Sequence, residues 1–270
     1  MKIGIIGAGA MGSGIAQIAS QACHNVVLTD LNQDVLNSSE SKQAKIMTRL
    51  VEKGRITQDD STAIQGRIHR STDLKNQSDC SLVIEAVVEN MDIKKAVFNE
   101  LESIVSEDTI LASNTSSLSI TSIAKNCRIS ERVVGLHFFN PAPLMPLVEI
   151  IPALQTKEGI TDKLLKLMRD WGKSPVLAKD TPGSIVNRVA RPFYSESLRI
   201  LEEGLADVDT IDSAMREQGF RMGPFELMDL IGHDVNYAVT ESVFKSFYYD
   251  PRYKPSLTQL KLVEANWLGK

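Results

Sequence analysis

The feature that most constrains the fold is a glycine cluster near the start of the chain, in the segment KIGIIGAGAMGSGIAQIAS. A short apolar run precedes the cluster, and Met11, Ile15 and Ile18 follow at helical spacing, which predicts a strand, a tight turn and a helix. Glycines at positions 7, 9 and 12 complete the pattern G-x-G-x-x-G. The first glycine of such a pattern permits the turn, the second lets a pyrophosphate approach the backbone, and the third lets helix and strand pack closely. The cluster therefore predicts a dinucleotide-binding unit, with cofactor contacts along the turn at Gly7, Ala8, Gly9, Ala10, Met11 and Gly12.

An acidic residue indicates which dinucleotide binds. A second strand is expected at residues 25–30 and ends on Asp30. In this kind of unit a carboxylate at that place accepts hydrogen bonds from a ribose hydroxyl. It would repel a 2'-phosphate by about 4 kcal/mol for a charge pair at contact range near a protein surface. We predict NAD rather than NADP; the alternative is that Asp30 is a solvated loop residue.

The remaining pattern predicts an α/β fold with two domains. Further short apolar runs occur at residues 82–87, 109–114 and 132–139, and helical patterns separate the earlier ones. Strands that alternate with helices favour a Rossmann-type doubly wound, mostly parallel sheet. We place this domain at residues 1–183 and a smaller all-helical domain at residues 184–270, in which Pro192, Gly204, Gly223, Pro224 and Pro251 are expected breaks or kinks.

Composition excludes several classes of function. The net charge of -4 argues against a protein that grips nucleic acid or an anionic membrane. No apolar run reaches the roughly 18 residues that a membrane span needs. Cys23, Cys80 and Cys127 are widely spaced and have no metal-ligand pattern, so we expect reduced thiols and no metal site. A soluble cytoplasmic protein fits these observations.

Two titratable residues stand in apolar surroundings in the segment RVVGLHFFNPAPLMPLVEII. The segment predicts two strands joined by a proline-rich turn, and the strands carry His137 and Glu149. A neutral imidazole is the side chain best suited to take a proton near pH 7, and a carboxylate on its other nitrogen would fix the tautomer. We predict that His137 is a general base that Glu149 orients. The alternatives are a structural histidine and a plain buried ion pair.

Three other groups are candidates for binding. The segment SNTSSLS follows a predicted strand, so Ser116 is expected at the sheet edge where ligands bind, although its serines also suit a helix N-cap. Asn187 follows the predicted domain boundary and is either an amide donor to substrate or a solvated helix residue. A basic stripe on the second helix is either a solvated face or a landing surface for a phosphate-rich substrate; it comprises Lys42, Lys45, Arg49 and Lys53.

Seven segments in order along the chain carry a resemblance to a known family: IGAGAMGSGIAQ, IEAVVENMDIK, ILASNTSSLSI, GLHFFNPAP, LVEII, DTPGSIVNR and MGPFELMDLIG. Together they resemble the short-chain L-3-hydroxyacyl-CoA dehydrogenases, including 3-hydroxybutyryl-CoA dehydrogenases. The resemblance implies NAD-dependent, reversible oxidation of a 3-hydroxyacyl-CoA to the 3-ketoacyl-CoA in fatty acid metabolism. It also implies a homodimer formed through the C-terminal helical domain.

The resemblance also implies roles for individual residues. The family's catalytic residues fall on His137, Glu149, Ser116 and Asn187, and its substrate contacts on Ser116, Lys53 and Asn187. Its cofactor contacts fall on the glycine turn and on Asp30, Glu89, Lys94, Asn114 and Asn140. The chain departs from the usual family residues at Pro146, Ser184 and His233.

Two alternative functions stay open. One is an enzyme acting on a different hydroxy acid, such as the dicarboxylic 3-hydroxyadipyl-CoA or a free β-hydroxy acid. The other is a non-catalytic, structural dinucleotide-binding relative, which would need none of the residues at His137, Glu149, Ser116 and Asn187.

Overall fold

The computed structural model describes residues 1–269 and divides the chain into two compact units, Met1–Asp180 and Thr181–Lys270. The division falls three residues before the boundary expected from the sequence, because the Thr-Pro-Gly link groups with the helices that follow it. Within the described residues, no helix is both long and apolar enough to cross a membrane.

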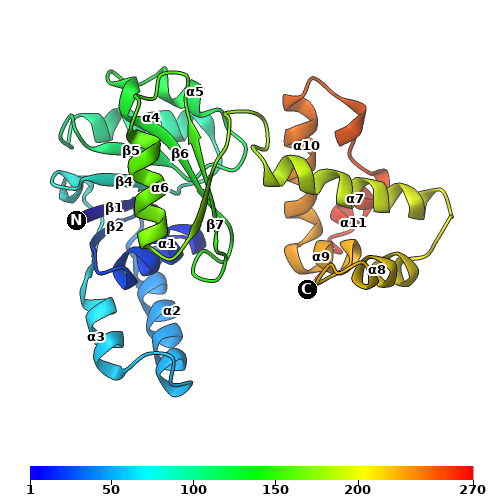
Figure 1. The fold of residues 1–270 in the computed structure, drawn as a ribbon, viewed down its shortest axis with the longest axis horizontal. Coiled ribbons are helices and arrows are strands. Elements are labelled where there is room, and N and C mark those ends of the chain that lie inside the picture. Colours follow the sequence, from blue (N-terminus) through cyan, green and yellow to red (C-terminus); the bar gives the residue numbers. More distant parts are fainter. Residues whose placement is uncertain (270) are drawn as a thin grey trace. The chain divides into compact units, whose positions relative to one another are not determined.

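An eight-stranded sheet forms the centre of the first unit (Figure 1), in the order β3-β2-β1-β4-β5-β6-β7-β8. All neighbouring pairs are parallel except β6 and β7, which pair antiparallel. The predicted doubly wound, mostly parallel sheet is therefore confirmed. The strands are β1 Lys2–Ile6, β2 Asn25–Thr29, β3 Ile68–Ser71, β4 Leu82–Glu85, β5 Ile110–Ser113, β6 Val133–Phe138, β7 Leu147–Pro152 and β8 Ser174–Leu177.

Helices cover both faces of this sheet because its strands are apolar on both sides. One apolar layer joins Ile15 of α1 and Leu164 of α6 to the sheet, and a second joins Phe98 of α4 and Ile123 of α5 to the opposite face. The helices of this unit are α1 Ala10–Gln21, α2 Gln33–Glu52, α3 Gln58–Gly66, α4 Met91–Glu102, α5 Ile120–Ala124 and α6 Ile160–Asp170.

Side-chain caps explain where several of these helices begin. Asn32 and Asn90 accept hydrogen bonds from the first-turn amides of α2 and α4. Thr57 and Asp60 form a capping box at the start of α3. These caps hold the helices at fixed points relative to the strands that precede them.

The second unit is entirely helical over residues 181–269, as expected. Its elements are α7 Val186–Glu202, α8 Val208–Glu217, α9 Pro224–Ile231, α10 His233–Ser246, the 3-10 turn Pro251–Tyr253 and α11 Leu257–Glu264. Tyr194, Leu198 and Met228 form its small apolar core. The helix α7 continues through Pro192, so that residue does not end the helix. Gly204, in contrast, lies just beyond the end of α7 with a φ of 69°.

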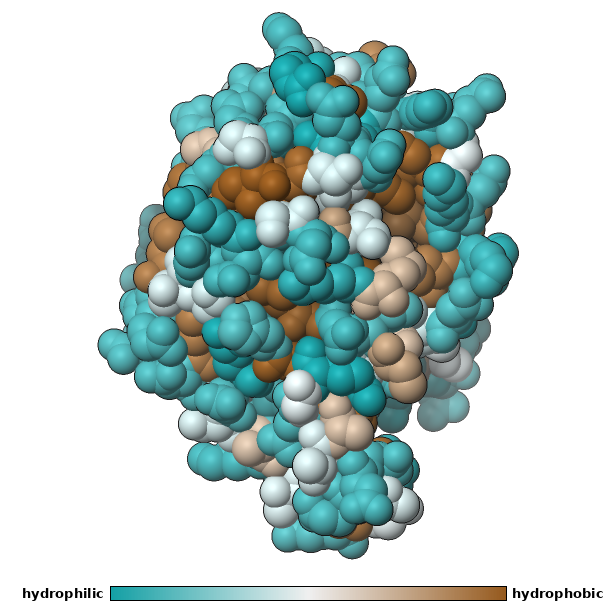
Figure 2. All heavy atoms as spheres, turned by 90° about the vertical axis from the view of Figure 1, so that its left-hand side faces the viewer, coloured by the Kyte–Doolittle hydropathy of each residue, from teal (hydrophilic) through white to brown (hydrophobic). Residues whose placement is uncertain are grey.

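The surface seen in Figure 2 is mostly hydrophilic, and apolar residues show there only in small patches between polar side chains. Exposed polar residues and a buried apolar interior are the normal division in a folded protein.

The three cysteines differ in their exposure, since Cys23 is exposed whereas Cys80 and Cys127 are buried. Burial raises the pKa of Cys80 to about 11 and that of Cys127 to about 12, so both thiols are protonated near neutral pH.

Candidate active site

The carboxyl ends of the parallel strands bring the predicted site residues to one edge of the sheet. The glycine turn follows β1, Asp30 follows β2, and Glu89 follows β4. A serine-rich segment, residues 114–119, follows β5 and is called the serine loop below. His137 lies near the end of β6. It pairs with Glu149 near the start of β7, which runs antiparallel to β6. In a doubly wound sheet this is the edge where ligands bind.

The glycine turn has the geometry that a pyrophosphate site requires. Gly7 has a φ of 96°, and a Cβ there would lie 2.6 Å from the carbonyl oxygen of Ala86. A Cβ on Gly12 would collide with the carbonyl of Gly7, so the third glycine allows α1 to approach the strand. A Cβ on Gly9 would meet nothing within 4 Å, which leaves space for a ligand against the backbone at the start of α1. These residues therefore fit a dinucleotide phosphate.

Asp30 is bonded to this turn. Its Oδ2 accepts a hydrogen bond of 2.8 Å from the amide of Ala8, and its Oδ1 accepts one of 3.0 Å from the amide of Asn32. The carboxylate is thus held beside the glycine turn, where a ribose joined to the phosphate would lie. Direct contact between Asp30 and a ribose stays a prediction.

His137 and Glu149 form a buried pair. They are directly opposite each other in the β6–β7 ladder, and His137 Nδ1 lies 2.8 Å from Glu149 Oε2. Side chains on paired residues share a face of the sheet, which explains how two polar groups in apolar strands meet. The exposed fraction is 7% for the His137 side chain and 1% for that of Glu149. The structure therefore brings these two side chains into contact, as the sequence predicts.

The pairing fixes how the imidazole can act. With Nδ1–H donated to the carboxylate, the neutral ring carries its lone pair on Nε2. Within residues 1–269, no hydrogen bond is formed by that nitrogen. The ring of Phe139 lies 4.4 Å from that of His137, centroid to centroid. The geometry therefore suits proton transfer at Nε2.

One carboxylate, that of Glu89, accepts hydrogen bonds from several residues of the serine loop. Glu89 Oε1 accepts from the Thr115 hydroxyl at 2.6 Å, from the Ser116 amide and hydroxyl at 2.9 and 3.3 Å, and from the Ser117 amide and hydroxyl at 3.1 and 3.0 Å. Burial by itself raises the pKa of Glu89, but these donors and the charge of Lys94 outweigh it, so the pKa lies below its ordinary value. Glu89 is ionised at neutral pH and fixes Ser116 in place.

Lys94 and Asn114 also lie at this edge. Lys94 is 1% exposed and forms ion pairs with Glu85 at 2.7 Å and with Glu89 at 3.4 Å. The Asn114 Oδ1 accepts a hydrogen bond of 2.8 Å from the amide of Phe138 and so joins the end of β5 to β6 beside His137. Both residues hold the edge together, and their predicted contact with the cofactor stays a prediction.

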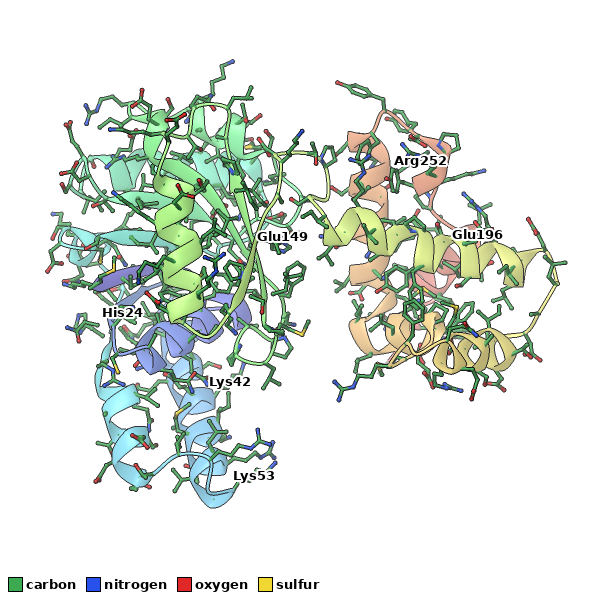
Figure 3. All side chains as sticks on the ribbon, viewed as in Figure 1. His24, Lys42, Lys53, Glu149, Glu196 and Arg252 are labelled. Carbon is green, nitrogen blue, oxygen red and sulfur yellow. The ribbon has the colours of Figure 1, made fainter. Side chains whose placement is uncertain are left out.

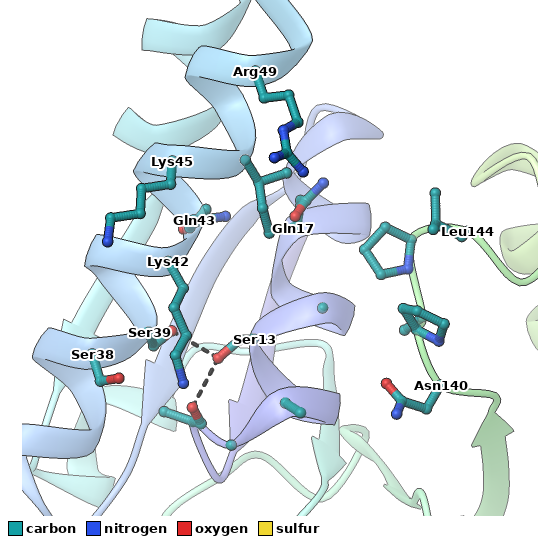
Figure 4. Close-up of a pocket in the computed structure, with 18 of the residues that line it drawn as sticks. Ser13, Gln17, Ser38, Ser39, Lys42, Gln43, Lys45, Arg49, Asn140 and Leu144 are labelled. Carbon is teal, nitrogen blue, oxygen red and sulfur yellow. Dashed lines mark hydrogen bonds between the residues drawn. The ribbon is translucent and has the colours of Figure 1, made fainter. Parts of the chain in front are cut away.

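A cavity of about 1030 Å³ adjoins the glycine turn (Figure 4). Ala8, Gly9 and Ala10 of the turn are among its lining residues. In Figure 4 the basic face of α2 lines one wall, and Asn140 and Leu144 of the β6–β7 turn stand opposite. Lys42, Lys45 and Arg49 of the basic stripe are lining residues. Lys53 caps the far end of α2 (Figure 3) and is not among them. Three of the four stripe residues thus border this cavity.

Asn187 lies in the first turn of α7, within the helical unit. The structure therefore places it on a different compact unit from His137, Glu149 and Ser116. Its predicted role beside the substrate stays a prediction.

Several residues at this edge were not identified from the sequence. Glu85 and Ser113 are the last residues of β4 and β5 and are fully buried. Lys173 donates hydrogen bonds of 2.7 and 2.9 Å to the carbonyls of Ala142 and Met145, which holds the turn that carries Asn140. A polar residue closing an otherwise apolar strand was the available signal for Glu85 and Ser113.

The fold and this edge together define a dinucleotide-binding α/β protein with a paired histidine and glutamate. Comparison with known families narrows the class. Residues 2–181 match the 3-hydroxyacyl-CoA dehydrogenase, NAD binding domain, and residues 183–270 match the C-terminal domain of the same enzymes. The chain belongs to the 3-hydroxyacyl-CoA dehydrogenase family, an NAD-binding family of oxidoreductases. The predicted family, enzyme class and NAD cofactor are confirmed.

Individual relatives agree with this assignment. The chain is 46% identical to a 3-hydroxyadipyl-CoA dehydrogenase of Escherichia coli K12 over 99% of its own length, and it spans only 57% of that protein. It is 40% identical to a probable 3-hydroxybutyryl-CoA dehydrogenase of Deinococcus radiodurans, with 100% of this chain and 97% of the relative covered. A crystal structure of a 3-hydroxybutyryl-CoA dehydrogenase from Escherichia coli K12 superposes with a TM-score of 0.98 at 45% identity and covers 100% of this chain and 57% of the other.

Proposed function

We propose that the protein catalyses reversible, NAD-dependent oxidation of an L-3-hydroxyacyl-CoA to the 3-ketoacyl-CoA. The observation that carries the proposal is the buried His137–Glu149 pair at the sheet edge that also carries the glycine turn. The β1 and β6 strands are separated by three strand spacings, about 14 Å at the usual distance between strands. A dinucleotide that lies along this edge with its phosphates at Gly9 can extend toward His137.

His137 acts as the general base in the oxidising direction. Its Nε2 takes the proton of the substrate hydroxyl, while the bound NAD supplies the acceptor for the hydride that leaves the same carbon. Glu149 holds Nδ1–H and stabilises the imidazolium that forms. In the reducing direction the imidazolium returns the proton to the oxygen.

Other residues orient the substrate in this proposal. Ser116, fixed by Glu89, hydrogen-bonds the substrate oxygen, and the amide of Asn187 stabilises charge on it. The phosphate-rich coenzyme A handle lies against the basic side of α2, where Lys42, Lys45 and Arg49 line the cavity and Lys53 extends the positive charge.

The acyl group is the open part of the substrate. Relatives carry names for both a four-carbon acyl group and a dicarboxylic one, 3-hydroxybutyryl and 3-hydroxyadipyl. We favour the short acyl group, with the dicarboxylic group as the second candidate because the relative at 46% identity has that name. A cytoplasmic location and a homodimer through the helical unit remain predictions; sedimentation equilibrium tests the dimer.

Steady-state kinetics test the function. Acetoacetyl-CoA, 3-oxoadipyl-CoA and free acetoacetate are compared as substrates, with loss of NADH absorbance as the readout. We expect the largest kcat/KM for acetoacetyl-CoA and no turnover of the free acid. A larger kcat/KM for 3-oxoadipyl-CoA would favour the dicarboxylic substrate. No turnover of any thioester, together with measurable NADH binding, would leave a non-catalytic dinucleotide-binding protein.

A further inference from the structure

A buried network of charges lies behind the serine loop of the proposed site. Glu85 is the last residue of β4, has no solvent exposure, and pairs in the sheet with Ile6 on one side and Ser113 on the other. Its backbone is therefore fixed by two parallel ladders.

The two oxygens of Glu85 have separate partners. The Oε1 accepts from Lys94 Nζ and from the amide of Val87, both at 2.7 Å. The Oε2 accepts from the Ser113 hydroxyl at 2.6 Å. Hydrogen bonds to charged groups of this kind are among the stronger ones in proteins. Glu85 thereby determines where the buried ammonium of Lys94 stands.

Lys94 passes this constraint on to Glu89. Its Nζ lies 3.4 Å from Glu89 Oε2, on the side of the carboxylate opposite the loop. Glu89 Oε1 then accepts the hydrogen bonds from Thr115, Ser116 and Ser117. The side chain of Glu89 is 36% exposed, so without Lys94 water would compete for it.

We propose that Glu85 is a positioning residue that fixes the Ser116 loop through Lys94 and Glu89. This role rests on the proposed function, in which Ser116 contacts the substrate oxygen. With the Glu85 charge removed, Lys94 is drawn toward Glu89 as its remaining carboxylate partner. Glu89 then turns from the loop, and the amides of Ser116 and Ser117 lose their acceptor.

Amide hydrogen exchange tests this directly. In Glu85→Gln, exchange at Ser116 and Ser117 is expected to be about tenfold faster or more than in the wild type, because each amide loses a hydrogen bond to a charged acceptor. Turnover of acetoacetyl-CoA is expected to fall about tenfold or more, since a misplaced catalytic group lowers the rate steeply.

Glu102→Gln is the matched control. Glu102 forms a buried ion pair with Arg132 at 3.2 Å in the same unit, but within residues 1–269 it forms no hydrogen bond or ion pair with Lys94 or the serine loop. Its replacement should lower stability without changing exchange at Ser116 and Ser117. Faster exchange in both variants alike would mean general loosening and would overturn the proposal.

A second variant covers the case in which Glu85→Gln does not fold. The pair Glu85→Gln and Lys94→Met removes both charges together, which avoids leaving one buried charge unpaired. Its Ser116 and Ser117 amides should also exchange faster, because Glu89 has lost Lys94. Wild-type exchange in either folded variant overturns the proposal. Absence of turnover in the wild type would refute the proposed function alone, because the exchange measurement does not depend on catalysis.

Discussion

At the scale of single residues, the chemistry depends on where two carboxylates stand relative to their partners. The Glu149 carboxylate accepts the Nδ1–H of His137, which leaves the lone pair of Nε2 for the proposed transfer of a substrate proton. The Asp30 carboxylate accepts a hydrogen bond from the amide of Ala8, which keeps a negative charge beside the glycine turn. In the proposed function the first carboxylate orients the base for proton transfer, and the second is predicted to favour NAD over NADP.

Replacement of His137 by alanine tests the first role. We expect turnover to fall by about two orders of magnitude or more, the usual contribution of a positioned base. NADH affinity should change little, because the histidine does not hold the phosphates. His69→Ala, an exposed histidine on β3 of the same sheet, is the control. An equal loss of NADH binding in His137→Ala would count against the assignment.

Replacement of Asp30 by serine tests the second role. Without the carboxylate the repulsion of a 2'-phosphate disappears, so kcat/KM for NADP relative to NAD should rise at least about tenfold, within the 4 kcal/mol scale of a contact charge pair. Asp59→Ser, which removes an exposed charge from the first turn of α3, should leave the ratio unchanged. An unchanged ratio in Asp30→Ser would refute the ribose interpretation.

At the scale of elements, strand ends and helix ends are joined by buried polar contacts. The Asp180 carboxylate accepts from the amides of Ile120 and Thr121 at 3.0 and 2.7 Å, so it closes the start of α5 just after the serine loop. Glu102, at the end of α4, accepts from the amides of Arg128 and Ile129 at 2.6 and 2.9 Å and pairs with Arg132 before β6. These contacts join the end of α4 to the segment before β6 and cap the start of α5.

The Glu102 pair predicts a dependence of stability on pH. Burial raises the pKa of Glu102, but the amides of Ile129 and Arg128 and the Arg132 guanidinium outweigh it, so the pKa lies below its ordinary value. A lowered folded-state pKa stabilises the protein above the unfolded-state value, about 4.3, and this contribution is lost as pH falls through the folded-state value.

The measurement is the free energy of unfolding of wild type and Glu102→Gln from pH 7 to pH 3. The variant should be less stable by roughly 3 kcal/mol at pH 7, the scale for breaking a buried pair. The difference should shrink as pH falls below about 4. A difference that stays constant across this range would show that the ionised carboxylate is not what stabilises the α4–β6 contact.

At the scale of the whole molecule, the two compact units have separate apolar cores. The sheet unit buries apolar layers on both faces, whereas the helical unit has its own core around Leu198 and Met228. The predicted NAD contacts at the glycine turn and Asp30 all belong to the first unit. Separate cores predict that the units unfold as distinct cooperative parts.

Calorimetry with and without NADH tests this division. We expect two unfolding transitions. NADH should raise mainly the midpoint temperature of the transition that belongs to residues 1–180. At a hundred times its Kd, a ligand that binds only the folded state adds about 2.7 kcal/mol of stability. A single transition, or equal shifts in two transitions, would show that the units are thermodynamically coupled.

Local pattern was enough to predict the sheet, the glycine turn and the helical second unit, because each follows from periodicity and glycine placement along a continuous segment. It did not predict the edge strands β3 and β8, whose segments IHRS and SPVL are short and only partly apolar. Pairing with a neighbouring strand makes these segments strands, and that neighbour is distant in sequence.

The sequence by itself determined the family and the cofactor class and singled out His137 and Glu149 as candidate site residues, since these inferences depend on residue types within short segments. Tertiary structure alone decided the register that puts Nδ1 of His137 2.8 Å from Glu149 and the network that joins Glu85, Lys94 and Glu89. The physical reason is that side chains from β4, α4 and the serine loop meet only when parallel strands end at a common edge. Contacts across that edge depend on three-dimensional packing, to which spacing along the chain gives no direct guide.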